Sequence, residues 1–327
     1  MTTHVTRQIA ADNQGLREAG ALLRAGGLVA FPTETVYGLG ADATNGTAVA
    51  GIYEAKGRPR FNPLIIHVAS LEEAETFAVF SSLARRLAEA FWPGPLTLVL
   101  QQRAPSLISD LALAGLQSIA IRIPSSPIAR AIITAAGRPI AAPSANRSGR
   151  VSPTNPAHVL ADLEGRIDAI VMGEAAEVGV ESTIVSLLDD KPVMLRPGGV
   201  TRTQIEAVLG LVVTDPELHT PDDAPLAPGM LASHYAPHAI VRLNAKQIEP
   251  SEAALLFGSF LPKGYDTARA VFNLSPSGDL KEAATNLFAA LRGLDQSGAL
   301  SIAVAPIPEG GLGEAILDRL NRAAAPR

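Results

Sequence analysis

Residues 56–68 read KGRPRFNPLIIHV and place three cations immediately before a short run that is apolar up to its histidine. The apolar spacing of 47–55 predicts a helix before this stretch, and 64–68 predicts a buried strand after it. Helix and strand signals alternate in the same way on both sides. The first two thirds of the chain therefore predict an α/β fold, with short strands in a twisted mixed sheet rather than a purely parallel one.

The other elements of this sheet follow from apolar periodicity and from Gly and Pro breakers. Further helices are expected over 14–25, 71–91 (as one helix or two) and 126–136. Further strands are expected over 28–31, 96–100, 118–123, 140–142, 169–172, 183–187 and 193–195.

The chain changes character over 211–238, which is rich in Pro, Asp and Ala and has no sustained period. On composition alone this segment is a solvated linker. Beyond it a small α/β domain of fewer than 100 residues is expected. Its strands are predicted over 240–243, 253–257, 270–274 and 301–306, and its helices over 279–291 and 313–325.

The composition excludes several classes of protein. The 327 residues contain no cysteine, which excludes disulfides, thiolate catalysis, iron–sulfur clusters and cysteine-type zinc sites. The net charge of −5 disfavours a duplex nucleic-acid binder, which usually carries a basic excess. No apolar run approaches the roughly 18 residues of a membrane span, and the first residues lack the apolar core of a signal peptide. A cytoplasmic protein is the expectation.

Common catalytic motifs are also missing from the sequence. It has no Walker A loop, no G-x-S-x-G elbow and no H-E-x-x-H helix. His234 and His238 are four residues apart, but Pro237 between them argues against a helical metal pair. The glycines of 310–313 predict a plain strand-to-helix turn, because the dinucleotide-binding spacing is incomplete.

The cationic loop at 56–60 indicates more about function than these missing motifs do. Lys56, Arg58 and Arg60 alternate with Gly57 and Pro59. Arginine forks match phosphate and carboxylate oxygens, and glycine lets the backbone approach a ligand closely. Because these cations end a helix and flank an apolar strand, they predict an anion site rather than a solvated face.

Other polar groups sit at the expected strand ends: TETVYG at 33–38, PSANRSG at 143–149, and Arg196 in VMLRPG. Arg122 lies inside the apolar run IAIRIP, where it must find a counter-anion or face water from an edge strand. Taken alone, Arg122 fits either reading, and His67 fits a satisfied core histidine. Together these groups suit a polyanion beside a small zwitterion.

The sequence resembles the YrdC/Sua-type threonylcarbamoyl-AMP synthase family in its long, two-domain form. The motifs that carry the resemblance run in order along nearly the whole chain. They are FPTETVYGLG, KGRPRFNPLIIHV, WPGPLTLVL, IAIRIP, PSANRSG, ESTIV, PGMLASHYAP and GGLGEAILDRLNRAA. The resemblance implies a YrdC-like twisted mixed sheet with helices over 1–210, a linker and active-site lid over 211–238, and a smaller Rossmann-like α/β domain over 239–327.

The resemblance also implies an activity. Threonine and bicarbonate would give N-carboxythreonine, whose carboxylate attacks the α-phosphate of ATP, forming threonylcarbamoyl-AMP and pyrophosphate. The enzyme would be a nucleotidyltransferase that uses Mg²⁺ with ATP. Downstream proteins would transfer the threonylcarbamoyl group to tRNA, with direct tRNA binding weak or absent and no membrane association.

Residue roles carry over from the family motif by motif. Lys56 and Arg58 would be catalytic. The residues implied for threonine are Thr35, His67, Arg122, the backbone of Ala142, and Ser182. The residues implied for ATP are Arg58, Asn62, Ser118, Ser144, Ser152, Arg196 and Tyr235. The 211–238 segment would fold over the site, against the composition-only reading.

Two other functions stay open. An RNA-binding or ribosome-assembly protein could use the cations of 56–60, although the net charge of −5 counts against it. A carbamoyltransferase of hydrogenase maturation shares the first fold, but such proteins carry cysteine-rich zinc segments and this chain has no cysteine.

Overall fold

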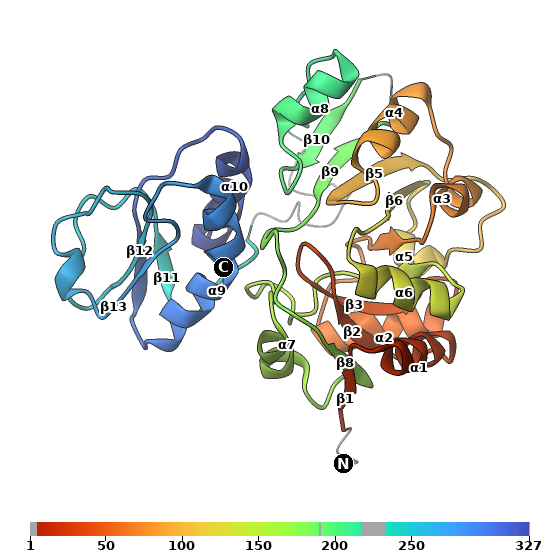
Figure 1. The fold of residues 1–327 in the computed structure, drawn as a ribbon, viewed down its shortest axis with the longest axis horizontal. Helices are drawn as coiled ribbons and strands as arrows, with labels where there is room; N and C mark the ends of the chain where they lie inside the picture. Colours follow the sequence, from red (N-terminus) through yellow and green to blue (C-terminus); the bar gives the residue numbers. More distant parts are fainter. Residues whose placement is uncertain (1–4, 190, 217–232, 327) are drawn as a thin grey trace. The chain divides into compact units, whose positions relative to one another are not determined.

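The computed structural model describes residues 5–189, 191–216 and 233–326. The chain forms two compact units (Figure 1). The larger unit contains Met1–Ser148, Pro153–Ala176 and Glu181–Met230. The smaller unit contains Leu231–Arg327 together with Gly149–Ser152 and Glu177–Val180.

A mixed sheet forms the larger unit. Within the described residues it has ten strands in the order β1-β8-β2-β3-β7-β4-β6-β5-β9-β10. Its strands are β1 Arg7–Ala10, β2 Val29–Pro32, β3 Tyr37–Asp42, β4 Ile65–His67, β5 Leu96–Gln101, β6 Ser118–Arg122, β7 Ile140–Ala141, β8 Ala169–Met172, β9 Thr183–Ser186 and β10 Val193–Arg196. Parallel pairs such as β4–β6 stand beside antiparallel pairs such as β5–β6, which confirms the predicted mixed sheet.

The helices of the larger unit connect and cover these strands (Figure 1). They are α1 Asn13–Arg24, α2 Gly46–Lys56, α3 Leu71–Phe77, α4 Ser82–Phe91, α5 Asp110–Leu113, α6 Pro127–Ala136, α7 Pro156–Leu163 and α8 Arg202–Leu209. The predicted 71–91 helix is two helices: the Ser81 hydroxyl caps α4 by accepting from the N–H of Ala84. Helices α1 and α6 pack closely, and a Cβ on Gly20 would lie 2.6 Å from the Cβ of Ala135.

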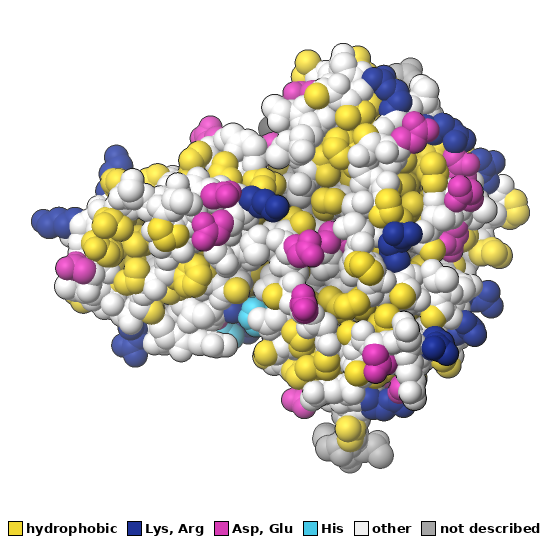
Figure 2. Space-filling model, viewed as in Figure 1, with side chains coloured by type: hydrophobic (Ala, Val, Ile, Leu, Met, Phe, Trp, Pro, Cys, Tyr) yellow, Lys and Arg dark blue, Asp and Glu magenta, His cyan; other side chains and the backbone are white. Residues whose placement is uncertain are grey.

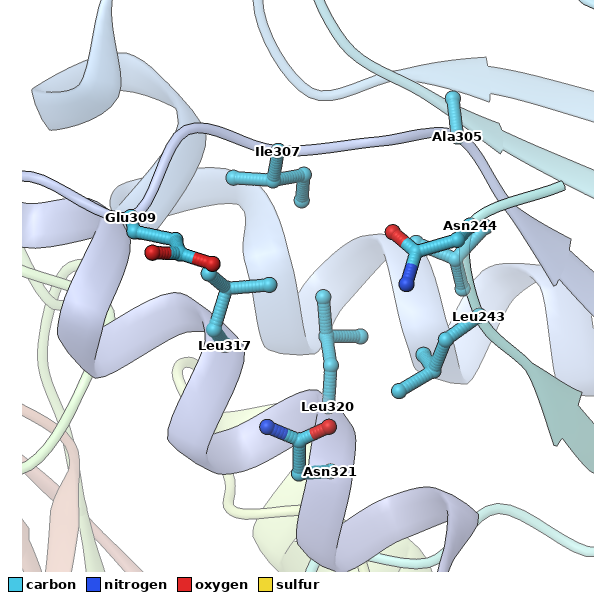
Figure 3. A pocket seen from close by; sticks show the side chains of 9 residues that line it. Leu243, Asn244, Ala305, Ile307, Glu309, Leu317, Leu320 and Asn321 are labelled. Atoms are coloured by element: carbon cyan, nitrogen blue, oxygen red, sulfur yellow. The ribbon is translucent and has the colours of Figure 1, made fainter. Parts of the chain in front are cut away.

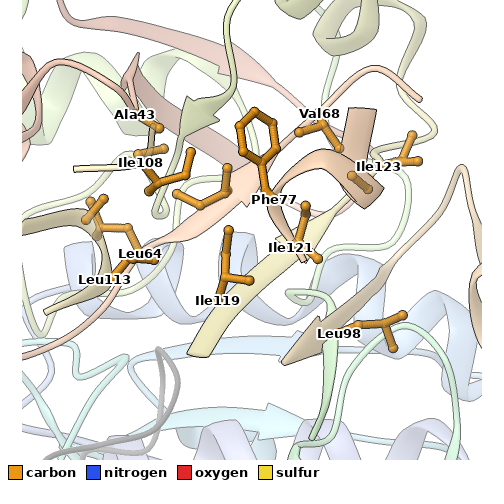
Figure 4. Close-up of a cluster of buried hydrophobic side chains, with 14 of the residues drawn as sticks. Ala43, Leu64, Val68, Phe77, Leu98, Ile108, Leu113, Ile119, Ile121 and Ile123 are labelled. Atoms are coloured by element: carbon orange, nitrogen blue, oxygen red, sulfur yellow. The ribbon is translucent and has the colours of Figure 1, made fainter. Parts of the chain in front are cut away.

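Alternation along the strands separates an apolar face from a polar one. In β6, Ile119 and Ile121 join the large apolar core with Leu98 and Val68 (Figure 4). Successive side chains of a strand point to opposite faces, so Ser118 and Arg122 belong to the other face. The polar residues predicted for the site therefore lie opposite the main core.

The sequence missed several elements for identifiable reasons. β1 buries only Ile9, so its apolar pattern is weak. β3 is rich in glycine, which is typical of turns rather than strands, but Gly40 pairs with Val29 in an antiparallel ladder. A side chain at Gly40 would collide with Phe31, because its Cβ would lie 2.6 Å from Cε1 of that ring.

The smaller unit has a parallel sheet in the order β11-β14-β12-β13. Its elements are β11 Ile240–Arg242, β12 Ala253–Leu256, the short helix η1 Tyr265–Thr267, β13 Ala270–Asn273, α9 Leu280–Gln296, β14 Ser301–Val304 and α10 Leu312–Ala324. This confirms the predicted small α/β domain. The 310–313 glycines form the expected turn, in which Gly311 has φ of 60° and precedes α10.

A cavity of about 220 Å³ lies in the smaller unit at the ends of β11 and β14, beside α10 (Figure 3). Its lining is mainly aliphatic, with Asn244, Glu309 and Asn321 at its polar edge. No residue predicted for the site contributes to it. Of the predicted lid, 217–232 lies outside the described residues. None of the described helices is both long enough and apolar enough to cross a bilayer.

Replacing Gly20 by Ala should destabilise the larger unit, because overpacking a tight interface typically costs about 1–3 kcal/mol. Gly51→Ala in α2 is the matched control, since its nearest neighbour, Leu28, would lie at an ordinary 3.4 Å from the new Cβ. Trp92 is the only tryptophan of the chain and belongs to the larger unit, so its fluorescence during urea unfolding reports on that unit. An unfolding midpoint for Gly20→Ala at or above that of Gly51→Ala would contradict this packing.

Candidate active site

The parallel pairing of β4 with β6 sets the geometry of the site. In this register His67 lies opposite Arg122, and Ile65 lies opposite Ala120. Because side chains alternate along a strand, Ser118 and Arg122 share a face with His67. The four-residue step from Ser118 to Arg122 covers roughly 13 Å. The polar face is thus a short track with one end at Ser118 and the other at Arg122.

Arg122 is fixed at its end of the track by three contacts. Its Nε donates to the carbonyl of Gly94 at 3.2 Å, and its Nη1 donates to Oγ1 of Thr35 at 3.1 Å. Its Nη2 forms an ion pair with Oε1 of Glu34 at 2.5 Å. Both charged side chains are buried. Arg122 has therefore found a counter-anion, and the alternative of a water-facing edge strand is wrong.

His67 is buried and neutral. Burial, helped by the Arg122 cation and only partly offset by Glu34 and backbone hydrogen bonds, lowers the pKa of its imidazole to about 3. Its Nδ1 lies 3.2 Å from the carbonyl of Ile65, which assigns the proton to Nδ1. Nε2 is then a hydrogen-bond acceptor. His67 therefore fits the interpretation as a satisfied core histidine, with backbone hydrogen bonds at Ile65 and Ile140.

Ser182 belongs to the same end of the track. It precedes β9, and its Oγ lies 2.8 Å from Oγ1 of Thr97 in β5. Thr97 is one residue before Leu98, which pairs with Ile121 of β6. Arg196 donates from Nη2 to the carbonyl of Ser182 at 3.0 Å and to its Oγ at 3.2 Å. Arg196, predicted for the nucleotide, therefore contacts a residue predicted for threonine.

The backbone of Ala142 borders β4. Its N–H donates to the carbonyl of Ile65 at 3.0 Å. Any contact of this backbone with an amino acid must therefore come from the Ala142 carbonyl. Thr35, the remaining residue predicted for threonine, is fully buried and contacts both Arg122 and Thr33 through its hydroxyl.

Lys56 ends α2 and holds the PSANRSG loop. Its Nζ donates to the carbonyl of Ser144 at 2.5 Å and to the carbonyl of Asn146. Its own carbonyl accepts from the N–H of Ser148 at 2.9 Å. Burial lowers the pKa of the ammonium well below its usual value, and the charge of Arg58 lowers it further.

Arg58 and Asn62 shape the loop before β4. Gly57 caps α2 with φ of 62°, a left-handed conformation that glycine adopts without strain. Arg58 Nη2 then donates to the carbonyl of Pro63 at 3.0 Å, two residues before β4 begins. Oδ1 of Asn62 is buried and has no hydrogen-bond partner among the described residues. Since buried polar groups are normally paired, this oxygen suits a ligand's donor.

Ser118 starts β6 and is buried, and Ser144 is half-buried. Ile65 faces Ala120, so Ser118, two residues earlier in the parallel strand, lies level with Pro63. Arg58, Asn62 and Ser118 thus gather at the start of β4, whereas His67 and Arg122 lie at its end. The predicted nucleotide and threonine residues largely separate to opposite ends of one track.

Two predicted residues belong to the smaller unit. Ser152 is fully buried in it. Tyr235 is also buried, with φ of 60°, stacked on Phe288 at 5.5 Å between ring centroids and covered by Arg319 at 5.2 Å. A large aromatic residue in the left-handed region is strained, which is a feature of functional segments.

Sequence reasoning missed Glu34 and Thr97. A buried arginine such as Arg122 needs a counter-anion. The available signal was Glu34, an acid in a polar turn that directly follows an apolar strand.

Buried cations and hydroxyls lie along one face of a mixed sheet, and the chain continues into a parallel α/β unit, as in a two-domain α/β protein. A family model described as telomere recombination matches residues 21–198. A second model, described as the C-terminal domain of threonylcarbamoyl-AMP synthase, matches 200–325. The chain belongs to the threonylcarbamoyl-AMP synthase family.

Individual relatives match this chain over nearly its full length. The threonylcarbamoyl-AMP synthase of Bacillus subtilis is 43% identical, covering 99% of this chain and 96% of the relative. That of Pyrococcus abyssi is also 43% identical, covering 95% and 94%. The crystal structure of P. abyssi Sua5 complexed with L-threonine superimposes with a TM-score of 0.88 at 40% identity, covering 98% of this chain and 97% of that one. The expected family and fold class are confirmed.

The imidazole of His67 should stay neutral across the physiological range. Its signals, assigned by comparison with His67→Gln in NMR spectra of histidine-labelled protein, should not move between pH 5 and 8. In urea the same histidine should titrate near its ordinary pKa of 6.5. Because the unfolded chain then binds the extra proton, His67 should lower the stability as the pH falls from 6.5 toward 3. A folded-state midpoint near 6.5 would contradict the burial argument.

Proposed function

We propose that this chain is an L-threonylcarbamoyladenylate synthase, a nucleotidyltransferase. It converts L-threonine, bicarbonate and ATP to threonylcarbamoyl-AMP, pyrophosphate and water. The observation that carries this proposal is the polar track, with Arg58, Asn62 and Ser118 at one end and His67 and Arg122 at the other. A track of this kind suits an amino acid lying next to a nucleotide.

Threonine would bind at the Arg122 end. Three of the five N–H groups of Arg122 are engaged with Gly94, Thr35 and Glu34. One N–H on each terminal nitrogen is left to pair with a carboxylate. The neutral His67 offers Nε2 to a hydroxyl or amine. Ser182 and the Ala142 carbonyl would complete the contacts.

ATP would bind at the Ser118 end. Asn62 Oδ1 would accept from an amino group, and Arg58, Ser118 and Ser144 would contact the nucleotide, together with Arg196 where the two substrates meet. The family resemblance also implies Ser152 and Tyr235 for the nucleotide and the 211–238 segment as a lid. A lid is useful because the carbamate intermediate is labile in water.

The chemical step would be a displacement at phosphorus. A carboxylate oxygen of N-carboxythreonine forms a bond to the α-phosphorus, and the bond from that phosphorus to the bridging oxygen of pyrophosphate breaks. The carbamate is already an anion, so no protein base is needed. Lys56 and Arg58 would stabilise the charge that develops on the phosphate oxygens. A bound triphosphate would also raise the lowered pKa of Lys56 and keep it protonated.

Mg²⁺ would arrive as part of the metal–nucleotide substrate. The described residues contain no group of three or more His, Asp or Glu that could hold a metal ion, so its ligands would come mainly from the triphosphate. ATP, threonine and tRNA meet in the cytoplasm, where this enzyme would act.

Other proteins would pass the threonylcarbamoyl group to tRNA. On the face of the larger unit shown in Figure 2, acidic and basic side chains are interspersed. Together with the net charge of −5, this supports weak or absent direct binding of tRNA by this chain.

Arg58→Ala should lower the rate of pyrophosphate release by roughly a hundred- to thousand-fold, the typical cost of losing one preorganised donor. Arg60→Ala is the matched control, because Arg60 belongs to the same loop and is exposed. Pyrophosphate release by the wild-type protein should require threonine, bicarbonate and ATP together. Equal rates for the two variants, or release without threonine, would contradict the proposal. Salt-sensitive RNA binding without ATP consumption would favour the RNA-binding alternative.

A further inference from the structure

We propose that Glu34 is a positioning residue that holds the Arg122 guanidinium and makes the amino-acid end of the site selective for a zwitterion over a simple carboxylate. This inference rests on the proposed function of the same site. Glu34 is part of neither the threonine set nor the ATP set that the family resemblance implies.

The carboxylate of Glu34 is anchored on both sides. Oε1 lies 2.5 Å from Arg122 Nη2, and Oε2 accepts from the backbone N–H of Ser126 at 3.3 Å. Ser126 caps α6, its own hydroxyl accepting from the N–H of Ala129. Glu34 thus ties Arg122 to the start of a helix and cannot swing freely. Burial alone would raise the pKa of Glu34, but the charge and hydrogen bond of Arg122, together with backbone hydrogen bonds, outweigh burial and hold the pKa below its usual value, so the carboxyl stays ionised.

Three separate segments then fix the plane of the guanidinium. Glu34 and Thr35 belong to the turn between β2 and β3, and Gly94 belongs to the turn before β5. A long, flexible arginine side chain loses rotamer entropy when it is ordered. Here that cost is met on folding, so substrate binding does not incur it. The remaining N–H on each terminal nitrogen is held ready for a carboxylate.

The charge balance at this end points to the ligand. Burying an unpaired guanidinium is costly, and one would attract any small anion. With Glu34 ionised and His67 neutral, Arg122 and Glu34 sum to zero. A ligand that brings both a carboxylate and an ammonium keeps that sum at zero. A ligand that brings only a carboxylate would leave a net negative charge in a low-dielectric pocket. Glu34 therefore favours an α-amino acid over the corresponding α-hydroxy acid.

Two substitutions separate the charge of Glu34 from its shape. Glu34→Gln keeps the size and an acceptor oxygen but removes the charge. Glu34→Asp keeps the charge but shortens the side chain by one methylene, which moves the carboxylate away from Arg122. Glu89→Gln in α4 is the matched control, because Glu89 is an exposed residue of the same unit. Thermal unfolding of each variant reports on any structural loss separately.

The test measures KM for threonine, KM for ATP and kcat, with threonine affinity measured by calorimetry without ATP. We expect the threonine KM to rise in the order wild type, Glu34→Asp, Glu34→Gln, reaching at least tenfold. The ATP KM should stay within about twofold, and kcat at saturating threonine within about threefold. Inhibition by 2,3-dihydroxybutanoate, the α-hydroxy analogue of threonine, should weaken less than threonine binding in Glu34→Gln. The ratio of the two affinities should fall at least tenfold.

Several results would overturn the inference. These are an unchanged threonine KM in both variants, a parallel rise of the threonine and ATP KM values, or an unchanged preference for threonine over its hydroxy analogue. If Glu34→Gln does not fold, Glu34→Asp alone decides, because an unaltered threonine KM would show that the position of the carboxylate is unimportant. A wild-type protein that neither binds threonine nor releases pyrophosphate would instead refute the proposed function.

Discussion

The pairing of β4 with β6 is the constraint on which the site depends. It sets His67 opposite Arg122 and places Ser118 two pleats away on the same face. A slip of β6 by one residue would send Ser118 and Arg122 into the apolar core and bring isoleucines to the site. That shift is prevented by the core itself, since Ile66, Ile119 and Ile121 are almost completely buried on the opposite face. Packing on one side of the sheet thus fixes the chemistry on the other.

Burial of charge is the second constraint. The side chains of four cations of the site are only 2–9% exposed: Lys56, Arg58, Arg122 and Arg196. Each is held by hydrogen bonds to backbone carbonyls, and Arg122 also pairs with the Glu34 carboxylate. Carbonyl dipoles offset part of the desolvation cost without neutralising the charge. These donors are therefore ordered before any ligand arrives, as electrostatic catalysis requires.

The sequence was most informative where apolar periodicity and charge coincide. Residues 56–68 predicted a helix, a cationic loop and a buried strand, and α2 and β4 confirm the two elements. Glycine-rich β3 could not be predicted, because its residues are selected by close approach to Phe31 rather than by strand propensity. Glu34 was missed because ion pairing between residues 88 positions apart depends on the fold and not on local pattern. The family motifs supplied residue roles, but they gave no sign that Arg196 contacts Ser182.

Charge is distributed unevenly along the track, and this difference orders the two substrates. At the Ser118 end, the two buried cations Lys56 and Arg58 donate to backbone carbonyls, and this pair of positive charges suits a polyphosphate. At the other end Glu34 cancels Arg122, and His67 stays neutral. A triphosphate placed at that end would meet the Glu34 carboxylate, whereas at the Ser118 end it would meet the cations Lys56 and Arg58. The same small face can therefore hold two different ligands in one orientation, because the fold places the Glu34 carboxylate beside Arg122 at one end.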